Sequence, residues 1–317
     1  MFARCRIRLA VLRALVLCCL AFCCANRAAA QDLSPRAYLI TPVRTNVVVL
    51  NYSYLSGGLQ FNGATPITGA EAKINAPLLS YYRSFGVFGR AADLSVAQSY
   101  GFGTFKGTVT DVPKSAQRSG FLDLYARLAV NLIGGPAMEP AVFSTWRQNW
   151  LLGVSLEIVA PTGQYDPTRV VNFGNNRWGF KPELGYSKRF GRWVLDAYGG
   201  VWFYTANPQY YPGKRTLSEA IVGAVQVHLS RDFIKSRLWV SLDANDWRGG
   251  ETSLNGVASM GTNQKNSRVG ITAAFRITRH QSVKLSVSEG AYISYGGNYR
   301  DVTLAWQYAW VDIPRLH

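Results

Sequence analysis

Apolar and polar residues alternate along most of the chain, and the alternation is clearest between residues 121 and 132. One face of that segment carries Leu122, Leu124, Ala126, Leu128, Val130 and Leu132, and the other carries Phe121, Asp123, Tyr125, Arg127, Ala129 and Asn131. A period of two over about ten residues is typical of a barrel strand with lipid on one side and the lumen on the other. The segment therefore predicts a membrane-spanning β-strand.

The same pattern recurs along the chain and predicts about twelve strands. They are expected at 46–56, 73–85, 91–102, 120–132, 150–160, 178–188, 193–205, 218–230, 237–247, 267–277, 282–289 and 301–310. The fold class predicted is all-β: a closed antiparallel transmembrane β-barrel of about 12 strands.

Short and long connections alternate between these strands. Short ones are expected at 86–90, 189–192, 231–236 and 278–281, and long ones at 57–72, 103–119, 161–177, 206–217, 248–266 and 290–300. Bacterial barrels have short periplasmic turns and long extracellular loops, so both termini are expected in the periplasm. The exception is 133–149, a long periplasmic connection in which 140–148 is expected to form a short helix or to lie along the inner interface.

Aromatic residues support the membrane assignment. The last strand places Val302, Leu304, Trp306, Tyr308 and Trp310 on one face, which resembles the C-terminal signal read by the barrel assembly machinery, although seven residues follow it. Near other strand ends lie Trp150, Trp178, Trp193 and Phe203, where aromatic rings can form belts at the two interfaces.

The first 30 residues predict a cleavable signal peptide. Four arginines precede an uncharged apolar run at 14–25, and Ala28–Ala30 offers small residues for cleavage after Ala30. This divides the chain into a signal peptide, 1–30, and an outer-membrane β-barrel, 31–317, exported in a Gram-negative cell. All five cysteines lie in the first part, so the barrel has none.

The charge of the barrel is strongly basic. The predicted signal peptide holds five of the 34 basic residues and none of the 18 acidic ones, which leaves a formal net charge of +11. A basic surface facing outer-membrane lipid and lipopolysaccharide explains this excess, and a lumen biased towards anions is the alternative. The charges are scattered, which argues against nucleic-acid binding. After residue 30 no run of 18 apolar residues occurs, which excludes helical membrane spans.

Polar residues on the inward faces are the candidate solute path. Sequential strands place Asp123, Arg127, Glu157, Lys181, Glu183 and Asp196 on one charged wall, and a second group comprises Asp243, Arg268, Arg276 and Lys284. Tyr125, Tyr198 and Trp239 add aromatic surface. The wall is either a salt-bridge network that stiffens the barrel or a path that selects solutes. Arg127 is expected to be central, paired with Glu157 or open to a passing carboxylate or phenolate.

Catalytic chemistry is not indicated. After residue 30 the histidines are His228, His280 and His317, and neither a G-x-S-x-G nor an H-E-x-x-H motif occurs. Scattered histidines do not predict a metal site, and no cofactor is expected. A structural or adhesive barrel without transport, or a lipid-modifying enzyme, are the alternatives to a transport protein.

Six stretches spread over the chain carry a family resemblance: NYSYLSGGLQF (51–61), RLAVNLIGGPAM (127–138), PTGQYDP (161–167), NRWGFKPELGYSK (176–188), WRGGETSLNG (247–256) and NSRVGITAAF (266–275). In these stretches the chain resembles the MetA-pathway of phenol degradation family of outer-membrane proteins. The resemblance implies a transporter-like barrel associated with aromatic-compound metabolism, and it implies no catalytic residues. The function expected is uptake or passage of a small hydrophobic or aromatic solute through a narrow, charged, porin-like lumen, since twelve strands enclose less space than a sixteen-stranded porin.

Overall fold

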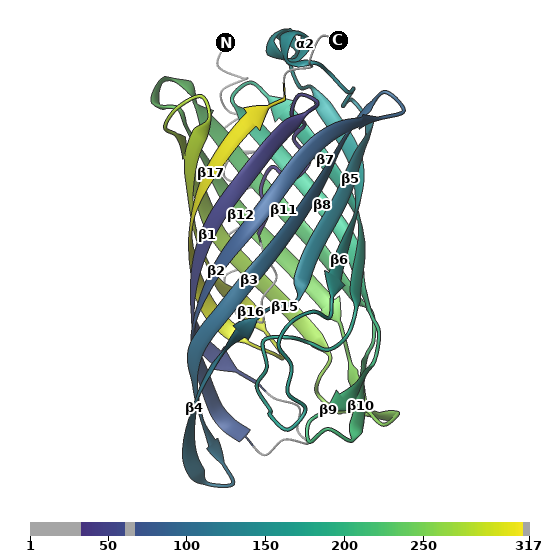
Figure 1. Cartoon of the computed structure of the whole chain (residues 1–317), viewed down its shortest axis with the longest axis vertical. Helices are drawn as coiled ribbons and strands as arrows, with labels where there is room; N and C mark the ends of the chain where they lie inside the picture. Colours follow the sequence, from purple (N-terminus) through teal and green to yellow (C-terminus); the bar gives the residue numbers. More distant parts are fainter. Residues whose placement is uncertain (1–32, 61–66, 313–317) are drawn as a thin grey trace, which may run out of the picture.

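The computed structural model describes residues 33–60 and 67–312, which form one closed antiparallel β-barrel (Figure 1). The predicted signal peptide lies outside the described residues. Twelve strand positions surround the lumen, and the ring closes because the first and last strands pair from Thr45↔Val311 to Gly58↔Asn298. The predicted fold class is therefore confirmed. No described residue belongs to a helix long and apolar enough to cross a membrane.

The barrel strands follow the chain around the ring. They are β1 (Thr45–Leu59), β2 (Ile67–Val87), β3 (Arg90–Val109), β4 (Val112–Phe121) with β5 (Leu124–Ile133), β6 (Trp150–Ala160), β7 (Gly179–Phe190), β8 (Trp193–Tyr204), β11 (Val222–Phe233), β12 (Leu238–Gly249), β15 (Gln264–Arg276), β16 (Gln281–Ile293) and β17 (Asn298–Val311). β1 begins and β17 ends at the end of the barrel that carries the short turns (Figure 1). Because bacterial barrels have their short turns in the periplasm, this end is the periplasmic one.

The fourth strand position differs from the prediction. β4 pairs only with the extracellular part of β3, from Tyr100 to Val109. β5 pairs with the periplasmic part of β3, from Ala92 to Ala97, and with β6. The break at Leu122 and Asp123 reverses the alternation, so Phe121 is 55% exposed on the outside instead of facing the lumen. Because β3 and β4 form a long hairpin, 103–109 and 112–119 are strand, joined by a two-residue turn, and not the long loop predicted. This hairpin projects beyond the barrel at the lower left of Figure 1.

Short strands also form within two of the predicted loops. β9 (Asn207–Tyr210), β10 (Arg215–Glu219), β13 (Thr252–Leu254) and β14 (Val257–Ala258) make a small separate sheet. At the opposite end, the connection between β5 and β6 contains α2 (Pro140–Thr145), in agreement with the short helix considered there. A single 3₁₀ turn, η1 (Ile234–Ser236), joins β11 to β12.

The outer surface is apolar at mid-barrel. On neighbouring strands, Leu94, Leu128 and Leu156 are direct register partners, and each is at least 40% exposed. The aromatic rings of Trp150, Trp178 and Trp193 also face outward nearer the strand ends. An outward band of apolar side chains flanked by aromatic rings is typical of the lipid face of an outer-membrane barrel, so this band is the surface that contacts lipid.

The orientation predicts where a protease reaches the protein in intact cells. Lys114 in the β3–β4 hairpin and Arg192 in the β7–β8 turn are both exposed, but they lie at opposite ends of the barrel. We expect added trypsin to cleave at Lys114 and not at Arg192, with fragments identified by mass spectrometry. Cleavage at Arg192 from outside would reverse the orientation.

Candidate functional site

Residues 33–44, which precede β1, lie inside the barrel and fill part of its lumen. Backbone N–H groups of Ser34, Arg36 and Ala37 donate to Gln226, Asp196 and the Tyr198 hydroxyl, all on inward positions of the wall. Leu39 and Ile40 pack with Met138 and Leu151 near the periplasmic end. We call residues 33–44 the plug segment. Its contacts with several strands place it in the periplasmic half of the lumen.

Tyr38 is the most buried residue of the plug segment, with 1% of its surface exposed. Its hydroxyl lies 2.8 Å from Ser155 Oγ and donates to Glu183 Oε1 at 3.1 Å. The ring lies against Gly153 and Gly185, which are register partners on β6 and β7. A Cβ at Gly185 would lie 2.1 Å from the ring, so the paired glycines create the slot that the ring occupies.

Arg36 fixes the plug segment nearer the periplasm. Its guanidinium donates to Asp232 Oδ1 at 2.7 Å and to Ser230 Oγ at 2.9 Å. It also lies over the ring of Trp239, 4.4 Å from the ring centre. Asp232 holds Arg189 as well, at 2.6 Å. The predicted aromatic Trp239 therefore contacts the plug segment.

Arg127 faces the lumen, as predicted, but its acidic partner differs. The guanidinium lies 3.5 Å from Asp93 on β3, whereas Glu157, its register partner on β6, bonds elsewhere. The other side of Arg127 covers the ring of Tyr38 at 4.7 Å. One nitrogen, Nη2, has no hydrogen-bond partner among the described residues. Arg127 thus contacts both Asp93 of the barrel wall and Tyr38 of the plug segment.

Three predicted wall residues form a compact charge cluster beside this point. Lys181 Nζ lies 2.5 Å from Glu183 and 3.4 Å from Glu157. All three side chains are largely buried, and the two acids share one lysine. A buried, hydrogen-bonded cluster of this kind stiffens the wall and places a strong local field in the lumen.

The second predicted group has buried members, Asp243 and Arg268, and an exposed member, Arg276. Asp243 is buried and accepts hydrogen bonds from Ser241 and Thr272, and it lies 2.8 Å from His228 Nδ1. Arg268 is 2% exposed and donates to Ser288 and to the Tyr299 carbonyl. Arg276, in contrast, is exposed at the periplasmic end of β15.

Asp123 does not lie in the charged wall with Arg127. It sits in the break between β4 and β5, and its carboxylate accepts hydrogen bonds from the backbone N–H groups of Gly163 and Asn175. Its observed role is to hold the 161–178 connection against the barrel. Tyr125, two residues further, lies on the inner face of β5, where it is half-buried.

The extracellular half of the lumen carries aromatic and apolar side chains. Trp247 is buried with Val222 and Ile293, and Trp202 and Tyr204 pack against them. Arg177 lies 4.3 Å above the Tyr204 ring and pairs with Glu219, and Lys181 lies 5.7 Å from the Trp202 ring. We call this set of six aromatic, apolar and cationic side chains (Trp247, Ile293, Trp202, Tyr204, Arg177 and Lys181) the aromatic chamber wall.

Sequence reasoning did not find the plug segment or Asp93. The plug segment has no strand alternation, so a period-two search passes over it. Two signals for it exist: the apolar triplet Tyr38-Leu39-Ile40 before the first strand, and the glycines at inward positions 153 and 185. The triplet does not point to the two glycines, because the sequence does not show that Gly153 and Gly185 are register partners on β6 and β7.

Replacing Arg127 by alanine tests its role at the contact between wall and plug segment. The change removes the cation over Tyr38 and the partner of Asp93, so we expect higher ion conductance and altered ion preference in planar bilayers. The lost cation–π contact costs about 0.5–2 kcal/mol and the unpaired buried Asp93 about 3–5 kcal/mol, but neither touches the backbone ladder that closes the barrel. Heat-modifiable migration on gels should therefore stay normal. If the variant fails to fold and its folded fraction conducts like the parent protein, Arg127 is a structural strut.

Comparisons with known proteins agree with this architecture. The family model described as "Putative MetA-pathway of phenol degradation" matches residues 51–310. The structure resembles the COG4313 outer membrane channel from Pseudomonas putida F1, with 18% identity, a TM-score of 0.72, and coverage of 88% of this chain and 100% of that chain. It also resembles the translocator domain of the autotransporter NalP from Neisseria meningitidis, with 13% identity, a TM-score of 0.50, and coverage of 86% and 90%. No curated protein matches the chain.

The fold and its neighbours define the protein as a β-barrel of the outer membrane. More narrowly, the chain belongs to the MetA-pathway of phenol degradation family.

Proposed function

We propose that the barrel mediates uptake or passage of small hydrophobic or aromatic solutes through its narrow, charged lumen. The observation that carries the proposal is the aromatic chamber wall, where cations lie over aromatic rings beside buried apolar side chains. Such a surface suits a solute with an aromatic ring and a carboxylate or phenolate, because the ring can stack while the anion meets Arg177, whose Nη1 has no hydrogen-bond partner among the described residues.

The proposal takes further support from the family and from the fold. The family description refers to phenol degradation, and a solved structure with this fold is described as an outer membrane channel. The predicted path residues Asp123, Arg127, Glu157, Lys181, Glu183, Asp196 and Asp243 remain proposals as solute contacts. Of these, Lys181 adjoins the aromatic chamber wall directly.

A matched pair of tryptophan variants tests the proposal. Trp202→Ala removes a ring from the lumen, and Trp178→Ala removes one from the outer surface near the same end. Loss of an aromatic contact of about 1 kcal/mol corresponds to roughly a fivefold effect. We expect Trp202→Ala to reduce phenol and benzoate uptake into proteoliposomes by about that factor, and Trp178→Ala to leave it unchanged. Equal uptake by protein-containing and empty vesicles would contradict the function.

A further inference from the structure

Three polar side chains stand in one row on the outer face of the wall, at the extracellular ends of β17, β1 and β2. Ser56 on β1 has Arg300 on β17 as its register partner on one side and Lys73 on β2 on the other. Side chains of a strand alternate between its two faces, and Tyr52 and Tyr54 of β1 are exposed on the outer one. Ser56 follows them at the same spacing, so it and its two partners face outward. We call Arg300, Ser56 and Lys73 the cation row.

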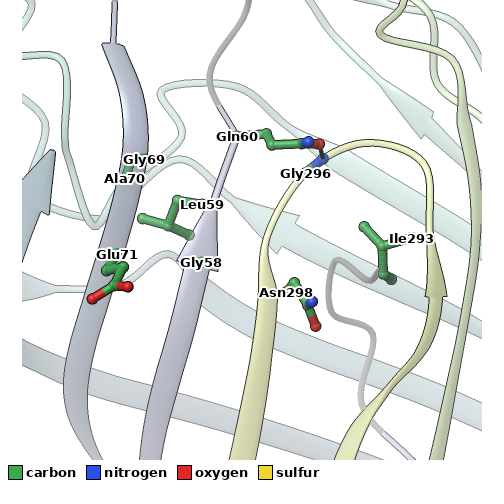
Figure 2. A pocket seen from close by; sticks show the side chains of 9 residues that line it. All are labelled: Gly58, Leu59, Gln60, Gly69, Ala70, Glu71, Ile293, Gly296 and Asn298. Carbon is green, nitrogen blue, oxygen red and sulfur yellow. Dashed lines mark hydrogen bonds between the residues drawn. The ribbon is translucent and has the colours of Figure 1, made fainter. Parts of the chain in front are cut away.

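The cation row lies at the depth of the lipid head groups. Among the outward-facing rows, the next one toward the periplasm holds the exposed Tyr54, and the one after it holds the exposed Leu304. Tyrosine rings are typical of the boundary between hydrocarbon and head groups. In the next row toward the cell exterior stand Asn298, Gly58 and Glu71, which Figure 2 shows on β17, β1 and β2. The cation row therefore lies between the hydrocarbon boundary and an acidic side chain.

A groove of about 610 Å³ opens on the outer face beside the cation row, and its lining includes Ser56, Arg300, Tyr54 and Val302. The groove forms because the ladder between β16 and β17 ends short of it, while β16 stays paired with β15 and β17 with β1. The lining thus offers a cation and a hydroxyl group in one row, and a tyrosine ring and a valine side chain in the next row toward the hydrocarbon.

Each member of the cation row has capacity for a further hydrogen bond. Arg300 donates from Nε and Nη2 to Glu289 Oε2, at 3.2 and 2.9 Å, and its Nη1 bonds no described residue. The Lys73 ammonium and the Ser56 hydroxyl likewise make no hydrogen bond or ion pair with any residue that the structure describes. Neighbouring strands are roughly 5 Å apart, so Arg300 and Lys73 flank Ser56 at a separation of roughly 10 Å, which two long side chains can bridge. One phosphate over Ser56 can accept hydrogen bonds from all three, and bonds between charged groups are the strong ones.

We propose that the cation row and its groove bind lipid A, the acylated and phosphorylated glucosamine disaccharide of the outer leaflet. The extracellular end of the barrel stands in that leaflet, so phosphate groups are present at the depth of the row. One phosphate lies over Ser56 between Arg300 and Lys73, and an acyl chain follows the groove past Tyr54. Glu71, beyond the row, repels the phosphate and keeps it at this depth. The site is on the outer face, so it is separate from the lumen and does not depend on the proposed function.

A second pair of cations at the same end of the barrel provides a matched comparison. Arg248 on β12 and Lys265 on β15 are register partners, and both are exposed. Arg248 bonds Asp246, as Arg300 bonds Glu289, so each pair consists of an arginine bonded to an acid and a lysine. Neither residue lines the groove, and no serine stands between them. The two pairs therefore carry the same charge and differ in the groove and the hydroxyl group.

Binding of lipid A to the detergent-solubilised protein, measured by native mass spectrometry, tests the site. The variant Arg300→Gln/Lys73→Gln removes both cations of the row, and Arg248→Gln/Lys265→Gln is the control with the same loss of charge. Ser56→Asp keeps both cations and places a carboxylate where the phosphate is expected. Lipid A, its dephosphorylated form and phosphatidylglycerol are added in turn. Heat-modifiable migration on gels shows whether each variant is folded.

We expect the parent protein to bind one lipid A, and the dissociation constant to rise about thirtyfold in Arg300→Gln/Lys73→Gln, the combined effect of two cations at an anionic lipid surface. Ser56→Asp should weaken binding as well, whereas the control Arg248→Gln/Lys265→Gln should bind like the parent.

Equal weakening in the two double variants would mean that charge alone attracts the lipid, and it overturns the site. Binding of dephosphorylated lipid A or of phosphatidylglycerol as tight as that of lipid A overturns it too, because the row then selects neither the phosphate nor this lipid. If the row variant does not fold, Ser56→Asp decides: a folded Ser56→Asp protein with the parent's affinity contradicts the proposal.

Discussion

Replacing Leu128 by arginine is expected to lower the free energy of unfolding by about 2–4 kcal/mol, the cost of an arginine near the bilayer midplane on the lipid face of a barrel. Leu128 lies in the middle of β5, is 45% exposed, and is flanked by the exposed register partners Leu94 and Leu156. A guanidinium at this point has neither water nor an acidic partner on the surface around it. Urea unfolding of the protein folded into lipid vesicles measures the loss.

Tyr125→Arg is the control for this prediction because it lies on the same strand and faces inward. Its new charge meets the polar lumen wall, so we expect a smaller loss of stability than for Leu128→Arg. An equal or larger loss at Tyr125 would show that lumen packing, and not contact with hydrocarbon, determines the cost. Both variants leave strand pairing unchanged, so the comparison isolates the face of the wall.

The strands were predictable because the bilayer imposes a simple rule on them. Every spanning residue faces either lipid or lumen, so the alternation around Leu128 and Arg127 appears directly in the sequence. The rule ends where a strand leaves the membrane. Beyond the membrane the alternation no longer marks the β3–β4 hairpin as strand, and it gives no sign of the break at Leu122 and Asp123, where the inward and outward positions exchange.

The inner face was predictable residue by residue but not pair by pair. Alternation places Arg127, Glu157 and Lys181 in the lumen, and the structure has them there. Which acid each cation contacts depends on side-chain length, on the register, and on what else fills the lumen. Arg127 bonds Asp93 because Lys181 holds Glu157 and because Tyr38 of the plug segment occupies the space in front of the guanidinium. No local pattern encodes an irregular segment that folds inward.

Removing the plug segment is expected to have the largest effect on conduction. We consider a variant in which residues 33–40 are replaced by a glycine–serine linker, so that Thr41 and the residues leading into β1 keep their hydrogen bonds with β2. The replacement removes Tyr38 from its slot between Gly153 and Gly185 and Arg36 from Asp232. Since the plug segment occupies part of the periplasmic half of the lumen, single-channel conductance should rise severalfold. The wall itself is held by its ladder, so heat-modifiable migration should remain normal.

The ion preference of that variant follows from the charges left on the inner face. The largely buried acids of the inner face are Asp93, Glu157, Glu183, Asp196 and Asp243, and the largely buried cations there are Arg127, Lys181 and Arg268. Loss of Arg36 removes a further positive charge, and a narrow channel with low-dielectric walls strengthens the field of those that remain. We therefore expect the opened pore to prefer cations, in contrast to the anion bias suggested by the net charge of the chain. The reversal potential in a potassium chloride gradient measures the preference, and Tyr38→Phe, which keeps the ring in its slot, should stay as closed as the parent. A replacement variant that conducts no more than the parent would mean that another part of the barrel, and not the plug segment, limits passage.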